Sequence, residues 1–206
     1  MTIKVASHSP LRLDPETAVE SLDWRTVFGR DGRVEIEIGI GKGRFLLEAA
    51  AARPEVLHLG VEWSNEYLRL AESRAEKRGL ENTRFVRVDA SDLVRRAVAD
   101  ASVFAYYVFY PDPWPKKRHH KRRIVQDGFV ALIASRLRTG GVFRLATDWQ
   151  PYADWMLETI GRCPLLRNES PDGGWSARPA SRPPTRFELR GQQLGHAVRD
   201  LAFRRT

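Results

Sequence analysis

The sequence has only one cysteine, Cys163, among its 206 residues. A chain with one cysteine can form neither an internal disulfide nor a cysteine-based zinc cluster. Its five histidines show no spacing typical of metal ligands on a helix. No apolar run approaches the ~20 residues that a membrane-spanning helix needs, and residues 1–20 lack the apolar core of a secretion signal. We therefore expect a cytoplasmic protein that holds no metal.

Positive charge, by contrast, is in excess. Lys and Arg number 34 against 26 Asp and Glu, which gives a formal net charge of +8. Such an excess favours a polyanionic partner such as nucleic acid or an anionic membrane, although charge alone does not identify it. The length predicts one domain over residues 1–206, in which residues 1–20 are a candidate flexible leader.

Segments with strand character alternate with segments of helical periodicity, without a repeat or a long linker. This order predicts an α/β fold: a doubly wound, mostly parallel sheet with helices on both faces. Ser64 or Asn65 is the expected N-cap of the second helix, and Ser91 or Asp92 the expected cap of a short helix after the third strand. Two more strands are expected after Leu165. The predicted strands are 33–41, 56–62, 83–89, 102–110 and 140–148, and the predicted helices are 44–52, 65–78, 124–137 and 152–160.

An acidic residue stands at the end of each of the first four predicted strands. Because ligands of such sheets bind at the carboxyl ends of the strands, we expect all four carboxylates at one site. Gly39 and Gly41 follow the first strand and allow a ligand to approach the backbone closely. A carboxylate about 20 residues beyond such a turn often binds ribose hydroxyls, and a further one can accept a hydrogen bond from an exocyclic amine. The four acids are Glu37, Glu62, Asp89 and Asp112.

The glycine turn distinguishes between nucleotide-like ligands. It has the sequence GIGKG, whereas dinucleotide-binding turns have the pattern GxGxxG and hold pyrophosphate at a helix N-terminus. Glu37 brings negative charge to the same place, which disfavours pyrophosphate and favours an ammonium or sulfonium group. S-adenosylmethionine carries both of these groups together with adenine and ribose. The sequence therefore predicts S-adenosylmethionine as the cofactor.

The stretch YPDPWPKKRHHKRR, residues 110–123, places three prolines around one Asp and one Trp and then eight residues without an acid. The prolines limit the backbone freedom of Asp112. Lys and Arg side chains in the block that follows are suited to contact RNA phosphates. Trp114 is interpreted either as a stacking surface for a base or as a packing residue behind a rigid loop, and the same two interpretations apply to Trp63 and Trp149.

These motifs together resemble the tRNA (guanine-N7-)-methyltransferases, a group with the Rossmann-like class I methyltransferase fold. The matching elements span nearly the whole chain after residues 1–20. Two departures are Pro115, where the family often has His, and Arg186, where Lys is usual and the planar guanidinium changes the contact geometry. The matching elements are EIGIGKG (37–43), GVE (60–62), DA (89–90), PDPWPKKRHHKRR (111–123), ATDW (146–149) and TRFELRGQQLGHAVRDLAFR (185–204).

The resemblance implies methyl transfer from S-adenosylmethionine to N7 of a guanosine in the variable loop of tRNA, by a monomer or a homodimer. It also implies three groups of contact residues. The expected cofactor-binding residues are Glu37, Gly39, Gly41, Glu62, Asp89, Ala90 and Asp112. The expected substrate-binding residues are Lys116, Asp148, Thr185, Arg186, Phe187 and Glu188, and the expected RNA contacts are Arg118, His119, His120, Lys121, Arg122 and Arg123.

Guanine N7 carries a lone pair and no proton, so its methylation requires no general base. A carboxylate near the base can fix its N1–H and N2–H₂ edge and stabilise the positive charge that develops. The candidates are Asp112, Asp148 and Glu188, and Asp112 ranks first because prolines flank it. His196 and Asp200 have a spacing of four residues, but their surroundings favour a strand and structural roles.

Three other readings of the same residues stay open. A nicotinamide-dependent oxidoreductase would have a GxGxxG turn and an acid or base at the hydride site, and neither is evident. A non-catalytic RNA-binding protein would have lost the acids at the strand ends, yet all four are present. A methyltransferase acting on a small molecule or a protein would leave the basic block unexplained.

Overall fold

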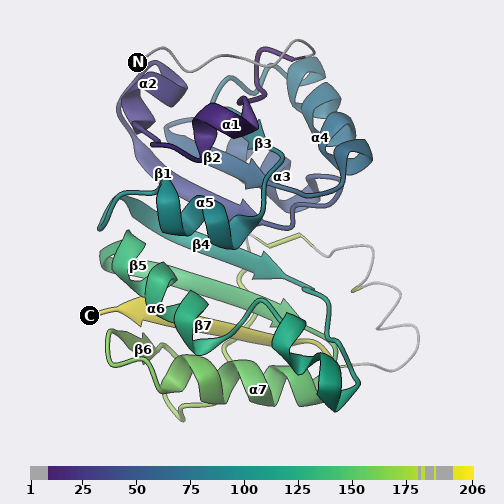
Figure 1. The fold of residues 1–206 in the computed structure, drawn as a ribbon, viewed down its shortest axis with the longest axis vertical. Helices are drawn as coiled ribbons and strands as arrows, with labels where there is room; N and C mark the ends of the chain where they lie inside the picture. The colour runs from purple at the N-terminus through teal and green to yellow at the C-terminus, as the bar shows by residue number, and fades with distance from the viewer. Residues whose placement is uncertain (1–8, 181, 184–187, 189–196) are drawn as a thin grey trace.

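The computed structural model describes residues 9–180, 182–183, 188 and 197–206. In this part of the chain seven strands form one sheet with the order β3-β2-β1-β4-β5-β7-β6 (Figure 1). Strand β7 runs antiparallel to both of its neighbours, whereas β1 to β5 are parallel. The strands are β1 Arg33–Ile38, β2 Val56–Val61, β3 Thr83–Val86, β4 Val103–Phe109, β5 Leu137–Thr147, β6 Leu166–Asn168 and β7 Arg199–Arg205.

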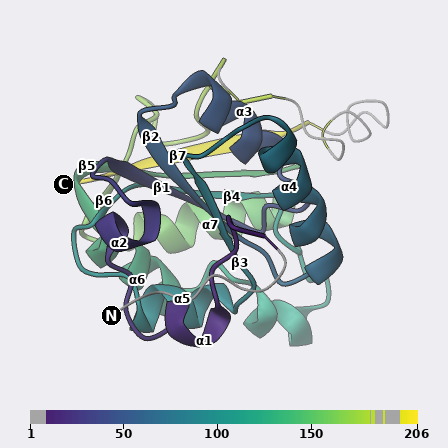
Figure 2. The same ribbon diagram turned by 90° about the horizontal axis from the view of Figure 1, so that it is seen from above.

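Helices cover both faces of the sheet (Figures 1 and 2). Helices α3 and α4 pack on one face, and the other helices pack on the opposite face around the larger apolar core. Gly43 begins α3 with a φ of 75°, and a Cβ atom there would lie 2.8 Å from the Cβ atom of Ala71 in α4. The helices are α1 Pro15–Ala18, α2 Trp24–Phe28, α3 Arg44–Ala52, α4 Asn65–Lys77, α5 Ala90–Arg96, α6 Asp127–Arg136 and α7 Gln150–Gly161, with a 3₁₀ helix η1 at Lys117–Arg122.

The predicted doubly wound fold is confirmed, and so is the order of its elements. Ser64 caps α4 as predicted, because its side chain accepts the N–H of Tyr67. The predicted cap of α5 was wrong: Asp89 takes that position and accepts the N–H groups of Ser91 and Asp92. Strand β5 begins at Leu137 rather than at residue 140, because Leu137 pairs with Val103 before an irregularity in the β4–β5 register.

Residues 9–20, which we expected to belong to a flexible leader, pack against the rest of the molecule. Leu13 donates its N–H to the carbonyl of Phe85, and Phe85 donates its N–H to the carbonyl of Leu11. Arg12 is 7% exposed and forms two hydrogen bonds, of 2.6 and 2.8 Å, with Glu72 of α4. This segment therefore extends the sheet beyond β3 by one short bridge.

Residues 199–205 form a strand as predicted, and Asp200 lies in it, while His196 lies outside the described residues. In the part of the chain that the structure describes, no helix has both the length and the apolar character needed to cross a membrane. The same part holds no group of three or more His, Cys, Asp or Glu side chains arranged for a metal ion.

Candidate active site

The four acids predicted to share a site all lie at the carboxyl edge of the parallel strands. Glu37 is the second-last residue of β1, where it pairs with Gly60 of β2 and with Tyr107 of β4. Glu62 directly follows β2, and Asp89 and Asp112 lie in the connections after β3 and β4. The edge therefore carries acids from four connections, at the end of the sheet where α/β proteins bind their ligands.

The glycine turn after β1 leaves open space in front of its backbone. Gly39 and Gly41 have φ values of 74° and 52°, in the left-handed region that favours glycine. A Cβ atom at either position would meet no atom of the described residues within 4 Å. The N–H of Gly41 and the N–H of Ser64 donate to the two carboxylate oxygens of Glu62, each over 2.8 Å. Glu62 is thus held at the mouth of the turn.

Glu37 is the unusual carboxylate of this edge. It is 5% exposed, and its Oε2 atom is buried without a hydrogen-bond partner among the described residues. Burial raises the pKa of Glu37 well above its usual value; the N–H of Leu46 opposes this rise and the nearby charge of Glu62 adds to it. A buried carboxylate oxygen that lacks a partner is costly, and a ligand with an ammonium group would supply a positive charge there.

Asp89 and Trp63 follow β3 and β2 at the same edge of the sheet. Asp89 is exposed, and its Oδ1 atom accepts the N–H groups of Ser91 and Asp92 at the start of α5. Ala90 is the first residue of that helix. Trp63 is 66% exposed, and the guanidinium of Arg87 lies 5.3 Å from its ring centroid. A Trp with this exposed fraction, next to Glu62, is more consistent with a ligand-contacting surface than with a packing residue.

Sequence reasoning missed Lys42 and Tyr67 as neighbours of this site. The ammonium of Lys42, in the glycine turn, lies 5.5 Å from the ring centroid of Tyr67, in the first turn of α4. Tyr67 is 40% exposed. A lone Lys and a lone Tyr at a helix start give no signal in the sequence, because only the fold brings the two together.

The loop after β4, which carries Asp112, is bounded by two strained residues. Tyr110 and Trp114 have φ values of 52° and 43°, and bulky side chains rarely adopt this conformation. Each such residue costs about 1–3 kcal/mol and persists only where its surroundings impose the conformation, and strain of this kind is concentrated at functional sites. Asp112 lies between them and is exposed. The loop is therefore held in a shape that the chain would not adopt by itself.

Arg123 is one of the groups that hold this loop, and the prediction that it contacts RNA is not supported by its position. It is 3% exposed, and its Nε atom donates to the carbonyl of Pro113 over 2.9 Å. Its guanidinium also lies 4.7 Å from the ring centroid of Tyr152 and 5.2 Å from that of Trp155, both in α7. The last residue of the basic block thus anchors the loop from inside the protein.

The rest of the block forms the 3₁₀ helix η1 and its approach, and most of it faces solvent. His119 and His120 are half-buried, with edge contacts to Trp114 and Trp155 respectively. The guanidinium of Arg122 lies 4.9 Å from the ring centroid of Trp114, so the ring of Trp114 already has a stacking partner. The exposed cations are Lys116, Lys117, Arg118, Lys121 and Arg122.

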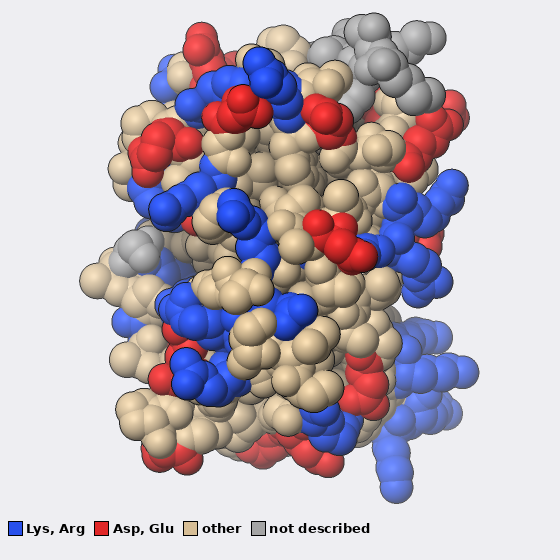
Figure 3. Space-filling view, turned by 90° about the vertical axis from the view of Figure 1, so that its left-hand side faces the viewer, with Lys and Arg blue, Asp and Glu red and all other residues tan. Residues whose placement is uncertain are grey.

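Positive charge also occurs elsewhere on the surface. Figure 3 shows Lys and Arg side chains, interspersed with Asp and Glu, on the end of the molecule where the parallel strands begin. Two of the cations at strand starts, Arg33 and Arg138, have their guanidinium groups 5.1 and 4.5 Å from the ring centroid of Phe104. What distinguishes the block at η1 is its freedom from acids and its position beside Asp112.

The remaining predicted substrate residues differ in their surroundings. Asp148 is half-buried and follows the end of β5. Glu188 is 1% exposed and forms ion pairs of 2.8 Å with both Arg178 and Arg182, so it is enclosed by protein. Thr185, Arg186 and Phe187 lie outside the described residues.

Residues 31–201 match the model of a protein family described as "Putative methyltransferase". A tRNA (guanine-N(7)-)-methyltransferase of Pseudomonas syringae pv. syringae (strain B728a) is 47% identical over 185 residues, which are 90% of this chain and 76% of the relative. A protein of the same name from Pseudomonas putida (strain KT2440) is 45% identical over 197 residues, 96% of this chain and 82% of the relative.

Solved structures agree on the fold. The 16S rRNA methyltransferase KamB superposes with a TM-score of 0.61 over 100% of both chains at 15% identity. A phosphoethanolamine N-methyltransferase of Haemonchus contortus, solved with S-adenosyl-L-methionine, superposes with a TM-score of 0.55 over 86% of this chain and 50% of that one, at 15% identity. These likenesses show the class I methyltransferase fold. Together with the sequence relatives, they show that this chain belongs to the tRNA (guanine-N(7)-)-methyltransferase family.

Proposed function

We propose that this protein transfers a methyl group from S-adenosylmethionine to N7 of a guanosine in the variable loop of tRNA. The observation that carries the proposal is the buried, unpartnered carboxylate oxygen of Glu37 beside an open glycine turn. The acid-free basic block supports the proposal. It follows β4, which is next to β1 in the sheet, and it therefore lies at the same edge as Glu37. The sulfonium of the cofactor supplies the electrophilic methyl group.

We assign the cofactor half of the site to the connections after β1, β2 and β3. Glu37 would pair with the ammonium group, which would supply a positive charge to this buried carboxylate. Glu62, already oriented by Gly41 and Ser64, would bind the ribose hydroxyls. Asp89 would accept from the exocyclic amine of adenine, with Ala90 and the exposed ring of Trp63 bordering the base. Gly39 and Gly41 leave room for the donor.

We assign the base to the connections after β4 and β5. N7 has no proton to lose, so the protein's task is to hold the base in line and to stabilise its growing positive charge. Asp112 suits both tasks, because its loop is held rigidly by Arg123 and by the residues around Tyr110. Asp148, which follows β5, is the second carboxylate of this half, and Lys116 stands at the start of the basic helix.

We assign tRNA binding to the exposed cations around η1. Their charges would neutralise RNA phosphates and release counterions, which makes the affinity fall as salt rises. A stacked guanine must also leave its stack before methylation, at a cost of a few kcal/mol. A cytoplasmic location and a monomeric or homodimeric state stay predictions.

The test is incubation of the purified protein with bulk tRNA from a strain that lacks this modification and with methyl-labelled S-adenosylmethionine. Nucleoside analysis should give 7-methylguanosine, and sequencing of cleaved tRNA should place it in the variable loop. Label in 7-methylguanosine elsewhere in tRNA would overturn the assigned position. Label in another nucleoside, or no label in RNA, would contradict the proposed methylation of guanine N7 in tRNA. A thermal-shift comparison with S-adenosylhomocysteine and NAD separates a methyltransferase from an oxidoreductase, because only the true ligand stabilises the fold.

A further inference from the structure

A buried ionic cluster lies behind the end of β4, outside the groups assigned to cofactor and base. At its centre is Arg182, which is 2% exposed. Its guanidinium donates to Glu188 over 2.8 Å and to Asp200 of β7 over 2.9 Å. Arg178 adds a second cation, 2.8 Å from Glu188, and donates to the backbone carbonyl of Arg182 over 2.7 Å. Arg182 and its two carboxylate partners are thus buried together, and the exposed Arg178 adds a second cation at their edge.

The cluster touches the strand end from which the Asp112 loop departs. The guanidinium of Arg182 lies 5.4 Å from the ring centroid of Phe109, the last residue of β4. Burial raises the pKa of the next residue, Tyr110, and the charges of Arg182 and Glu188 act on the same hydroxyl in opposite directions. Tyr110 is also the strained residue that begins the loop. The cluster therefore contacts the residues at which the Asp112 loop begins.

The cluster is also connected to the end of β5. Asp200 pairs with Ala146 in the β5–β7 register, two residues before Asp148. Burial raises the pKa of Asp200, and the charge of Arg182 opposes this rise. Arg182 lies in the connection between β6 and β7, and it therefore joins this connection to the ends of both strands that precede the carboxylates assigned to the base.

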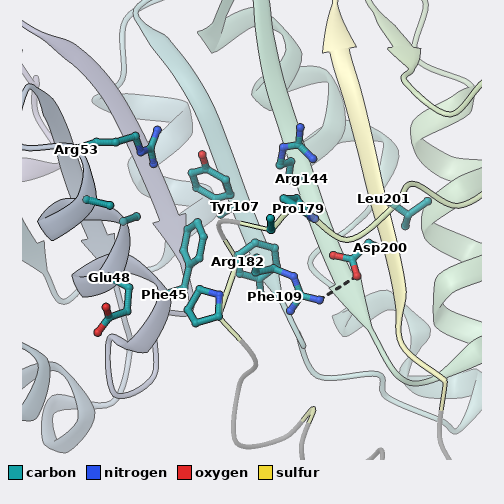
Figure 4. A pocket seen from close by; sticks show the side chains of 14 residues that line it. Phe45, Glu48, Arg53, Tyr107, Phe109, Arg144, Pro179, Arg182, Asp200 and Leu201 are labelled. Carbon is teal, nitrogen blue, oxygen red and sulfur yellow. Dashed lines mark hydrogen bonds and ion pairs between the residues drawn. The ribbon is translucent and has the colours of Figure 1, made fainter.

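The segment around Arg182 borders open space on the side that faces helix α3. A cavity of about 560 Å³ separates helix α3 from the segment that includes Pro179, Arg182 and Pro183. Figure 4 shows this cavity, with Arg182 and Asp200 pointing toward each other and the ring of Phe109 beside the guanidinium. On its α3 side the segment borders this open space, and on its other side the ion pairs of Arg182 with Glu188 and Asp200 hold it against β7. Replacing buried ion pairs by apolar residues is often neutral or stabilising, so such clusters are weak evidence of a purely structural role.

We propose that Arg182 is a positioning residue for methyl transfer. It holds the end of β4, and hence the Asp112 loop, in register with the end of β5 through its two carboxylate partners. This inference rests on the proposed function. It changes the role of Glu188, which was predicted to contact the substrate: Glu188 acts through Arg182, as an anchor inside the protein. The role requires the planar fork of a guanidinium, which reaches two carboxylates at once, whereas an ammonium is a point charge.

The test compares Arg182→Met and Arg182→Lys with wild type and with a matched control. Arg53→Met is the control, because Arg53 also forms a bidentate pair with a buried carboxylate, Glu35, but at the far end of α3. For each variant the melting temperature, the affinity for S-adenosylhomocysteine, and kcat and KM for tRNA methylation are measured. Arg182→Met should lower kcat on the order of 100-fold, with cofactor affinity within threefold of wild type. Arg182→Lys should recover part of the loss, and Arg53→Met should keep kcat within threefold.

Wild-type kcat in folded Arg182→Met would overturn the proposal. So would parallel losses of kcat, cofactor affinity and melting temperature, shared with Arg53→Met, because these indicate a structural role. If Arg182→Met does not fold, Asp200→Asn replaces it, since it removes one charge without changing the side chain's size. It should lower kcat about tenfold, and wild-type kcat in that variant would equally overturn the proposal. The two inferences fail separately: absence of 7-methylguanosine with wild-type protein contradicts the proposed function, whereas its normal formation by the variants contradicts only the role of Arg182.

Discussion

On the β1–β3 half of the carboxyl edge, Glu62 and Asp89 are oriented by backbone N–H groups of the glycine turn and of the helix starts that follow β2 and β3. On the β4–β5 half, the Asp112 loop is held by groups from distant parts of the chain, namely Arg123 with α7 and Arg182 with β7. The first half is thus ordered by backbone turns and helix starts. The second is a strained loop whose shape depends on the whole fold. The two halves should therefore respond differently to mutation, pH and salt.

The largest expected effect is on the strained half. Asp112→Ala should lower the single-turnover rate of tRNA methylation about 10²–10³-fold, as when one preorganised electrostatic contact to a transition state is lost. The measurement is rapid-quench methylation at saturating tRNA and cofactor. Asp154→Ala, at an exposed position in α7, is the control and should keep the wild-type rate. A wild-type rate in Asp112→Ala would remove Asp112 from the mechanism.

The second largest effect is expected on cofactor affinity, from a change in the β1–β3 half of the edge. Glu37→Gln should weaken the binding of both S-adenosylmethionine and S-adenosylhomocysteine about 30-fold or more, since both carry the ammonium group and truncating a buried charge partner costs about 2–5 kcal/mol. Its affinity for tRNA should stay unchanged. Isothermal titration calorimetry measures the first effect and filter binding the second. Equal weakening of cofactor and tRNA binding would contradict the division of the edge into two halves.

Glu37 also gives cofactor binding a pH dependence of defined sign. Burial raises its pKa in the free protein, so as pH falls the carboxylate takes up a proton that must leave before a cation can bind. Affinity should therefore fall as pH falls through the raised pKa and reach a plateau above it. Titrations in two buffers with different ionisation enthalpies should reveal proton release with wild type and none with Glu37→Gln. Proton release that persists in the variant would assign it to another group.

The two halves also differ in how much of them the sequence predicts. The acids of the first half, the glycine turn and the capping role of Ser64 follow from local patterns, and the fold places them as expected. The resemblance implies RNA contact for Arg123 and substrate contact for Glu188, yet both are buried. Whether an Arg at the end of a basic run faces water depends on what packs over it, here Tyr152 and Trp155 of α7. Local periodicity carries no information on such a contact.

The basic helix should affect RNA binding alone. Replacing Lys117 and Lys121 by Glu should weaken tRNA binding on the order of tenfold near 0.1 M salt, and should reduce the slope of log K against log salt by about 2. Cofactor affinity should stay constant, because both side chains lie in η1, outside the connections assigned to the cofactor. The control replaces exposed Lys77 and Arg95, which lie on other helices, by Glu and has the same change in charge. Equal weakening in control and test would indicate a response to net charge rather than to this helix.

The smallest effect on methylation is expected from a change inside the sheet, away from its carboxyl edge. His58 lies there in β2, next to Glu35 of β1. Burial lowers the pKa of His58 to about 4 from an ordinary value of 6.5. The unfolded chain therefore takes up this proton first as pH falls, and His58 alone should lower the free energy of unfolding by about 2 kcal/mol between pH 7 and pH 5. Raised pKa values of Glu37 and Asp200 act in the opposite direction, so the test is the difference between wild type and His58→Gln. Urea unfolding at both pH values should show a larger loss in wild type than in the variant, while both proteins bind S-adenosylhomocysteine equally at pH 7. An equal loss in the two proteins would mean that the imidazole of His58 is protonated in the folded state. His58 would then be more open to water than its exposed fraction of 2% indicates.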